Sequence, residues 1–393
     1  MARQNMNDQL QRRQSRNAAA ERLINQEETR KRQIRSWIIL VGVVLAVVLG
    51  IHFLRGYGAG KEIGAVRLPC YSNQSVTPFR DGLVYYDGAS LHHLSSGGTI
   101  RWSFPAGSDI NFSTGPTHLA MWSGRQLFLI DRNGNATYNE NLEGEVQFAR
   151  VGERYTAVVV GSDTEPKLIV KDLNGAQVDV ESDAYSGLLL LDAGFFGDQG
   201  EYMWTLALDV FGTAPNTILN TFQVGKMNTG AISLGEWMVY KVLYENTRLR
   251  VFSTQQVYSY DYKCVQDTNA TMLVYGWKLI DYEIPEHGRA KLLLAPTSQT
   301  SSAQVISELR VLEGDSDKRY TLPAKCVGAY MYGGNIYAVS GDYVYRADTG
   351  SQRFFAYRIP GDYGEVTACY GITGDGRMLL ASGDAMFSLT LPQ

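Results

Sequence analysis

Residues 76–105 read VTPFRDGLVYYDGASLHHLSSGGTIRWSFP and contain three short runs of β-branched, aromatic and aliphatic residues. The runs cover residues 82–86, 90–94 and 99–104, and turns rich in glycine separate them. β-Branched and aromatic side chains favour strands, and glycine favours the positive φ angles of tight hairpin turns. The stretch therefore predicts most of a small antiparallel sheet.

The middle run of this stretch recurs down the chain. Including this one, eight comparable runs occur: LHHLS (91–95), LFLID (127–131), LIVKD (168–172), TFQVG (221–225), VYSYD (257–261), LRVLE (309–313), VYRAD (344–348) and MFSLT (386–390). Successive copies end 36, 41, 53, 36, 52, 35 and 42 residues apart. A period of this length suits four-stranded blades around a common axis. We predict an all-β fold, an eight-bladed β-propeller. A seven-bladed ring with an extra hairpin is the alternative, because the segments around 183–236 and 277–322 are irregular.

The first and the last segment of the repeat region are expected to form one blade together. The last copy is followed by only three residues, which leaves its blade without a fourth strand. The run IGAVRL (63–68) precedes a proline, as the fourth-strand endings WSFP, YTLP and YRIP also do. We expect strand 63–68 to complete the last blade and so remove an exposed sheet edge.

Charge divides the chain into a basic tail and an acidic body. Residues 1–36 carry eight Arg and one Lys against four acidic residues, while the whole chain has a net charge of −4. An acidic body lacks the basic surface that nucleic-acid binding requires. We therefore expect no nucleic-acid partner.

Residues 37–54, WIILVGVVLAVVLGIHFL, carry no formal charge. Eighteen helical residues span about 27 Å, close to the apolar thickness of a bilayer. We predict a cytoplasmic tail (1–36), a single transmembrane helix (37–54), a linker (55–61) and a propeller (62–393) outside the cytoplasm, following the positive-inside rule. The rival interpretation is a cleaved signal peptide, but its charged and apolar regions would both be unusually long.

The four cysteines, Cys70, Cys264, Cys326 and Cys369, form no CxxC pair, which argues against a zinc ribbon or a thioredoxin-like site. In an exported domain they could form one or two structural disulfides. Inert, unpaired thiols are the other interpretation, and the sequence leaves both open.

The run GTIRW, which ends at Trp102, resembles the repeat of pyrroloquinoline-quinone-type propellers, in which a tryptophan docks neighbouring blades. Tyr138 and Asp179 stand in the corresponding region of the next two repeats, so the tryptophan is not retained. The whole layout is similar to an uncharacterised family of Firmicutes membrane proteins with a basic tail, one anchor and an external propeller. Quinoproteins of the resembling class hold their cofactor with adjacent cysteines and calcium, and this chain has no adjacent cysteine pair. The resemblance therefore implies a fold and a location without a cofactor.

Motifs for catalysis or metal binding are weak in this chain. Neither HExxH nor GxSxG occurs. His92 and His93 are neighbours on one predicted strand, so their side chains should point to opposite faces and should not share a metal ion. Residues 131–142 lack the glycine and glutamate positions of a calcium loop and fit a hairpin turn instead. We predict no catalytic, cofactor-binding or metal-ligating residues, and we consider an enzyme less favoured than a binding protein.

Two long inserts separate the second and third strands of their blades, at 209–217 and 295–304. In a propeller such loops emerge on one face, and the short connection at 253–256 between them would leave a groove. The predicted binding residues are Asp209, Val210, Phe211, Thr213, Asn216, Ser298, Gln299, Thr300 and Gln304. We therefore predict a membrane-anchored scaffold for a protein or cell-envelope partner. The alternatives are a divergent glycan-cleaving enzyme and a sensor of a small ligand.

Overall fold

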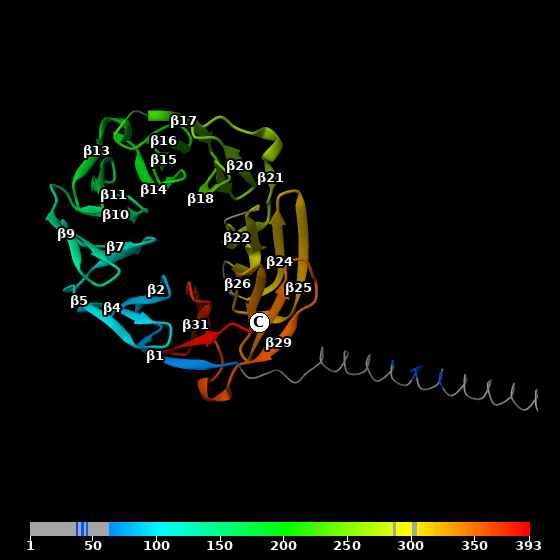
Figure 1. Ribbon diagram of the computed structural model, residues 1–393. Helices are drawn as coiled ribbons and strands as arrows, with labels where there is room; N and C mark the ends of the chain where they lie inside the picture. The colour runs from blue at the N-terminus through cyan, green and yellow to red at the C-terminus, as the bar shows by residue number, and fades with distance from the viewer. Residues whose placement is uncertain are drawn as a thin grey trace, which may run out of the picture. The chain divides into compact units, whose positions relative to one another are not determined.

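The computed structural model describes residues 63–226, 228–285, 288–300 and 305–393, together with Trp37, Val41, Gly42 and Leu45. The chain divides into two compact units, Met1–Ala59 and Gly60–Gln393. The second unit is built from eight four-stranded sheets that surround a central opening (Figure 1). This arrangement confirms the eight-bladed β-propeller.

The first four blades follow one another along the chain, each as four consecutive antiparallel strands. Blade 1 contains β2 (Ser75–Phe79), β3 (Gly82–Tyr86), β4 (Ser90–Ser95) and β5 (Ile100–Pro105). Blade 2 contains β6 (Asn111–Thr114), β7 (His118–Ser123), β8 (Gln126–Asp131) and β9 (Ala136–Asn141). Blade 3 contains β10 (Val146–Val151), β11 (Tyr155–Ser162), β12 (Glu165–Asp172) and β13 (Gln177–Glu181). Blade 4 contains β14 (Leu189–Phe196), β15 (Tyr202–Asp209), β16 (Asn216–Gln223) and β17 (Asn228–Gly235).

The next three blades repeat the pattern. Blade 5 contains β18 (Val239–Glu245), β19 (Arg248–Ser253), β20 (Gln256–Tyr260) and β21 (Met272–Leu273). Blade 6 contains β22 (Trp277–Glu283), β23 (Lys291–Pro296), β24 (Ile306–Glu313) and β25 (Ser316–Cys326). Blade 7 contains β26 (Gly328–Tyr332), β27 (Asn335–Val339), β28 (Tyr343–Asp348) and β29 (Phe355–Arg358). The segments around 183–236 and 277–322 thus form complete blades 4 and 6, so the seven-bladed alternative is wrong.

Blade 8 combines both ends of the propeller. Its sheet has the order β1-β32-β31-β30, with β1 (Ala65–Tyr71), β30 (Ala368–Ile372), β31 (Arg377–Ser382) and β32 (Ala385–Thr390). β1 runs antiparallel to β32, with Ala65 opposite Leu389 and Tyr71 opposite Ala385. The fourth strand of blade 8 therefore starts two residues after the beginning of the predicted segment 63–68 and continues past Pro69 to Tyr71.

Burial explains why the repeat is readable in the sequence. The second and third strands of each blade pack between neighbouring sheets, and four consecutive residues of β11, Ala157–Val160, are all buried. The outer strands face solvent on one side, so β5 alternates between exposed and half-buried residues. Strands covered on both faces read as continuous apolar runs, whereas half-covered strands alternate.

The connections between strands sort onto two faces of the ring. The turns between first and second strands, and between third and fourth strands, lie on the face where the chain enters β1; we call it the entry face. The turns between second and third strands lie on the opposite face. Three short helical turns, η1 (Asp183–Tyr185), η2 (Thr268–Ala270) and η3 (Gly361–Tyr363), and the single-turn helix α2 (Thr297–Thr300) occur in the connections.

The predicted membrane helix at 37–54 falls almost entirely outside the described residues. In the part of the chain that the structure describes, no helix combines the length and apolar character needed to cross a bilayer. All four cysteines are free thiols, and Cys70, Cys264 and Cys326 are buried. Burial raises the pKa of the Cys70 and Cys326 thiols to about 12, which makes them unreactive.

Candidate functional site

Neighbouring blades 1 to 4 are joined by residues on their outer strands. The indole nitrogen of Trp102 donates to the backbone oxygen of Arg132 in blade 2 at 3.0 Å. A Cβ on Gly134, whose φ is +86°, would lie 2.7 Å from the Trp102 ring, so glycine is required where the indole rests. Tyr138 lies in the same way against Gly175 of blade 3. The docking role predicted for Trp102 is therefore kept by Tyr138.

Blade 3 uses a carboxylate in this position. Asp179 accepts a hydrogen bond from the backbone nitrogen of Gly225 in blade 4 at 3.0 Å. The corresponding region of blade 4 uses a hydroxyl, because Thr229 donates to the backbone oxygen of Tyr262 at 3.0 Å. Different side chains thus close equivalent seams with different chemistry.

Blade 5 breaks this pattern. Its outer strand β21 contains only two residues, which pair with Gln256 and Val257 of β20. The preceding segment 261–271 is rich in polar residues and folds into turns and η2. The outer edge of blade 5 therefore does not extend along blade 6.

A cavity of about 630 Å³ occupies the space beside the short strand. It lies on the entry face between blades 5 and 6, and we call it the 5/6 cleft. Its charged lining residues are Glu245, Arg250, Asp267, Arg289, Arg310, Asp315 and Asp317. Cavities of this size hold small ligands or short peptide segments.

The arginines of the 5/6 cleft are matched by carboxylates. Arg310 donates from Nε and Nη2 to the two oxygens of Asp317 at 2.9 and 2.8 Å, and these bonds hold the pKa of Asp317 below its usual range. Arg289 approaches Asp315 at 3.4 Å in a well-exposed pair. Bidentate pairs of the first kind hold geometry well, and exposed pairs contribute little.

The pair Glu245 and Arg250 differs because it is mostly buried, with side-chain exposures of 8% and 18%. Arg250 Nε donates to Glu245 Oε2 at 3.1 Å, and the backbone nitrogen of Ala290 in blade 6 donates to Glu245 Oε1 at 2.8 Å. Glu245 therefore joins the two blades at the base of the cleft, where the outer strand does not.

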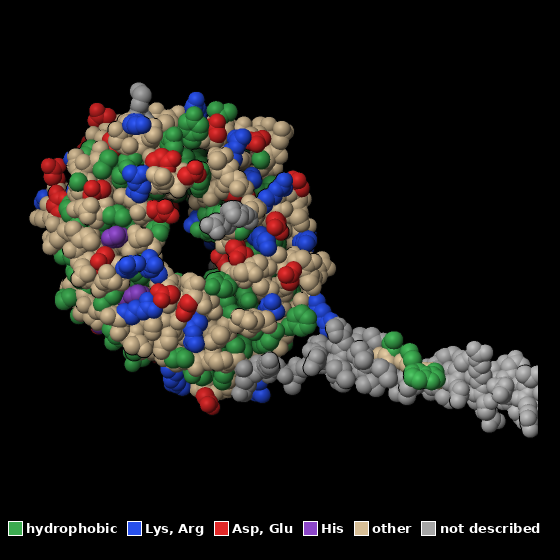
Figure 2. Space-filling view, in the orientation of Figure 1, with side chains coloured by type: hydrophobic (Ala, Val, Ile, Leu, Met, Phe, Trp, Pro, Cys, Tyr) green, Lys and Arg blue, Asp and Glu red, His purple; other side chains and the backbone are tan. Residues whose placement is uncertain are grey.

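Three exposed apolar side chains belong to the segment that contains β21. Val265, Leu273 and Tyr275 are 59%, 64% and 73% exposed. Of these three residues, Leu273 lines the 5/6 cleft. Because Leu273 pairs with Gln256 at the start of β20, Tyr275 lies toward the opposite face, whereas Val265 lies beside Asp261 at the entry face. On the face shown in Figure 2, acidic and basic side chains are interspersed around the central opening.

The first predicted binding loop, after β15, is held by its own blade. Asp209 Oδ1 accepts from the backbone nitrogen of Phe211 at 3.0 Å, and Asn216 Oδ1 accepts from Ser233 Oγ at 2.6 Å. Val210, Phe211 and Thr213 are exposed, with Phe211 65% exposed. Asp209 and Asn216 thus shape the loop, and the other three residues are free to contact a partner.

The second predicted loop contains α2. Gln299 forms two hydrogen bonds with Ser307, at 2.9 and 2.8 Å, and Thr300 donates to the backbone oxygen of Thr297 at 3.2 Å. Gln299 and Thr300 also line a cavity of about 250 Å³ with Tyr330. Ser298 is exposed, and Gln304 lies outside the described residues.

Both predicted loops lie on the face opposite the 5/6 cleft, because both join second to third strands. The hydrogen bonds of the first loop stay within blade 4, and those of the second stay within blade 6. The groove between the loops remains a prediction.

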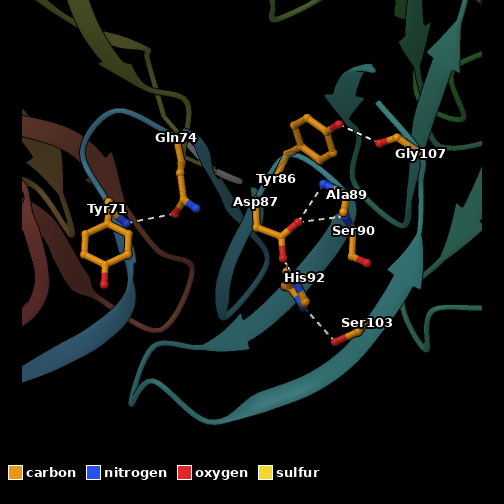
Figure 3. A network of polar contacts seen from close by, with 9 residues as sticks. All are labelled: Tyr71, Gln74, Tyr86, Asp87, Ala89, Ser90, His92, Ser103 and Gly107. Atoms are coloured by element: carbon orange, nitrogen blue, oxygen red, sulfur yellow. Dashed lines mark hydrogen bonds and ion pairs between the residues drawn. The ribbon is translucent and has the colours of Figure 1, made fainter. Parts of the chain in front are cut away.

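His92 and His93 point to opposite sides of β4, as predicted. His92 Nε2 lies 2.8 Å from Asp87 Oδ2, and His92 Nδ1 lies 2.7 Å from Ser103 Oγ (Figure 3). This network has the residue types of a serine-hydrolase triad, but in such triads serine contacts Nε2 and aspartate contacts Nδ1. Asp87 also accepts from the backbone nitrogens of Ala89 and Ser90, at 2.9 and 2.7 Å, and the bond with His92 lowers its pKa to about 2. The network therefore fastens β5 to the β3–β4 turn.

Among the described residues, no group of three or more His, Cys, Asp or Glu side chains is placed to hold a metal ion. The 5/6 cleft carries no motif that predicted it from the sequence. The available signal was the polar stretch 261–271, which follows the third strand of blade 5 in place of a β-branched run.

No protein-family model matches the chain, and no curated protein matches it. Similar solved structures include BamB from Moraxella catarrhalis, with 12% identity, a TM-score of 0.49, and coverage of 85% of this chain and 100% of that chain. The Pan2 WD40 domain from Neurospora crassa has 9% identity and a TM-score of 0.47, with coverage of 85% and 96%. Hsv2 from Kluyvelomyces marxianus has 10% identity and a TM-score of 0.46, with coverage of 73% and 98%. These are likenesses of fold.

Proposed function

We propose that this chain is a membrane-anchored, extracytoplasmic scaffold whose propeller binds a protein partner through the 5/6 cleft. The observation that carries the proposal is the cleft itself, where a shortened outer strand leaves a cavity of about 630 Å³ whose lining includes the exposed side chain of Leu273. A peptide segment with an apolar anchor and charges of both signs would match this surface, because its wall contains both arginines and carboxylates.

The location rests on the sequence. The uncharged run 37–54 follows a tail with eight Arg and one Lys, which supports an anchor with its N-terminus inside. The same layout is what the chain shares with the Firmicutes membrane proteins that it resembles. A polymer of the cell envelope is the competing partner.

Site-specific photo-crosslinking in cells of the native host tests the partner. A photoreactive amino acid in place of Leu273 should capture a discrete protein. The same substitution at Ile100, which is 52% exposed on the outer strand of blade 1, should not. Equal products from both positions, or a polysaccharide adduct at position 273, would contradict the proposal.

Thiol labelling in intact cells tests the location. Three native thiols are buried, so an impermeant maleimide should report mainly on introduced cysteines. Ser298→Cys, at an exposed position of the propeller, should be labelled in intact cells. Ser15→Cys in the tail should react only after the membrane is permeabilised. Labelling of Ser15→Cys alone in intact cells would reverse the proposed orientation.

A further inference from the structure

A second inter-blade cavity lies on the entry face between blades 1 and 2 and has a different electrostatic character. Its volume is about 360 Å³, and we call it the 1/2 pocket. Its charged lining residues are Arg80 and Asp81 of the β2–β3 turn, Arg101 of β5 and Arg132 of the β8–β9 turn. Three arginines and one aspartate amount to a formal charge of +2 in one small space.

The aspartate neutralises only one arginine. Arg101 donates from Nη1 and Nη2 to the two oxygens of Asp81, at 2.7 and 2.6 Å, and this pairing lowers the pKa of Asp81 to about 2. Arg80 uses one nitrogen for the backbone oxygen of Pro116, at 3.2 Å. A guanidinium has five N–H donors, so both side chains keep donors for a further acceptor.

A buried histidine also lines this pocket. His93 is only 1% exposed, and neither of its ring nitrogens makes a hydrogen bond of good geometry with a described residue, although the backbone of Phe79 lies close enough to act on its pKa. Its ring lies between Phe79 and Trp102, with both centroid distances at 5.3 Å. A buried polar group without a partner costs free energy, which a ligand in the adjoining pocket could recover.

The protonation state of His93 allows its ring to donate one hydrogen bond to a ligand. Burial lowers its pKa to about 4, and the positive charge of Arg101 acts in the same direction. The imidazole is therefore neutral near pH 7, with one N–H to donate and one nitrogen to accept. A partly protonated phosphate can use both, whereas a carboxylate can use only the donor.

We propose that the 1/2 pocket binds the phosphate group of a small phosphorylated ligand. Arg80, Arg101 and Arg132 supply the charge, and His93 supplies a hydrogen bond at the buried wall. Arginine is suited to phosphate because its planar fork can bind two oxygens at once. The volume exceeds that of a phosphate group, which leaves room for a short organic part. This site is separate from the 5/6 cleft and does not depend on the function proposed for it.

Calorimetric titration of the full-length protein with inorganic phosphate at constant ionic strength tests the proposal. Arg132→Gln should weaken phosphate binding about tenfold, and Asp81→Asn should tighten it severalfold because the pocket becomes more positive. Arg154→Gln, which removes an exposed arginine that lines neither cavity, is the matched control and should leave the affinity unchanged. Opposite effects of two substitutions in one pocket would not arise from misfolding.

His93 supplies an independent measurement. His93→Phe should weaken phosphate binding, whereas His93→Gln, which keeps a donor, should retain most of it. Nitrogen NMR of the wild-type ring should show a change in the ring-nitrogen signals when phosphate is added. The proposal fails if phosphate does not bind, if all variants bind it equally, or if the ring signals do not move. Tighter binding of acetate than of phosphate would reassign the pocket to carboxylates and overturn the phosphate assignment.

Discussion

The seam between blades 1 and 2 and the seam between blades 5 and 6 solve the same packing problem in different ways. In the first, the indole of Trp102 rests on the glycine turn of the next blade and donates to it at 3.0 Å. In the second, the outer strand is two residues long, and Glu245 accepts from the backbone of Ala290 instead. One seam is closed at its edge by an aromatic ring, and the other is held at its base by a buried carboxylate.

The two cavities beside these seams also differ, in volume and in the pairing of their charges. The 5/6 cleft is the larger, and its arginines face carboxylates. The 1/2 pocket is the smaller, and only one of its three arginines is paired with an aspartate. The pairing of charges in each cavity therefore indicates the kind of ligand better than the volume does. A wall whose arginines are all paired suits a peptide, and a wall with unpaired arginines suits an anion.

Among substitutions at the two seams, Glu245→Gln should have the largest effect on the free energy of unfolding. The substitution leaves Arg250 partly buried without its charge partner, which should lower the free energy of unfolding by about 3 kcal/mol. Asp315→Asn, in the exposed pair of the same cleft, should leave the free energy of unfolding nearly unchanged. Urea denaturation measures both. Similar losses for the two variants would show that the carboxylate does not hold the seam.

Trp102→Ala should lower the free energy of unfolding by about 2–3 kcal/mol, because a half-buried indole and its hydrogen bond to blade 2 are lost. Trp102→Tyr should recover part of this loss, since Tyr138 fills the same position one blade later. The same denaturation experiment compares them. If both variants match the wild type, edge docking contributes nothing to the first seam.

Asp281 extends the comparison to the seam between blades 6 and 7, where its Oδ2 accepts from the backbone nitrogen of Met331 at 2.7 Å. Burial raises the pKa of Asp281 to about 6, above the value near 4 expected in the unfolded chain. Between these values the folded state binds more protons than the unfolded state, so this residue's contribution to stability falls as the pH rises from 4 to 6.

Asp281→Asn should therefore gain stability relative to the wild type as the pH rises, by about 2 kcal/mol at pH 7. The two proteins should be closest near pH 4. Thermal melts at several pH values measure the difference, and the matched substitution Asp315→Asn should show no such trend. A difference that stays constant with pH would mean that Asp281 titrates normally.

The smallest expected effect is that of His92→Ala, about 1 kcal/mol, because the network with Asp87 and Ser103 is local to blade 1. Hydrogen exchange of the β5 amides should speed up while that of blade 5 stays the same. A network that also performed chemistry would show a change in turnover, so any hydrolase activity lost in Ser103→Ala would contradict the structural role.

The strands of the propeller could be predicted because they depend on local patterns. Each of the eight runs aligned with the copy at 91–95 overlaps a third strand, from β4 to β32. The docking role of Tyr138 was not predicted. A tyrosine can replace the docking tryptophan only when its ring lies against a glycine turn, and the glycine in question, Gly175, belongs to the next repeat. The predicted loop residues Asp209 and Asn216 proved to be occupied by bonds within their own blade.

The sequence by itself determined the period, the all-β repeat and the uncharged segment at 37–54, because side-chain alternation and turn residues act over a few positions. The choice between seven and eight blades needed the strand pairing of the tertiary structure. Only the tertiary structure decided where charges are balanced. Glu245 meets Ala290, and Arg132 lines a pocket with Arg80, because separate blades place their turns on one face. Whether a buried group such as His93 has a hydrogen-bond partner depends on the residues that neighbouring blades place around it. The spacing of residues along the chain does not predict this.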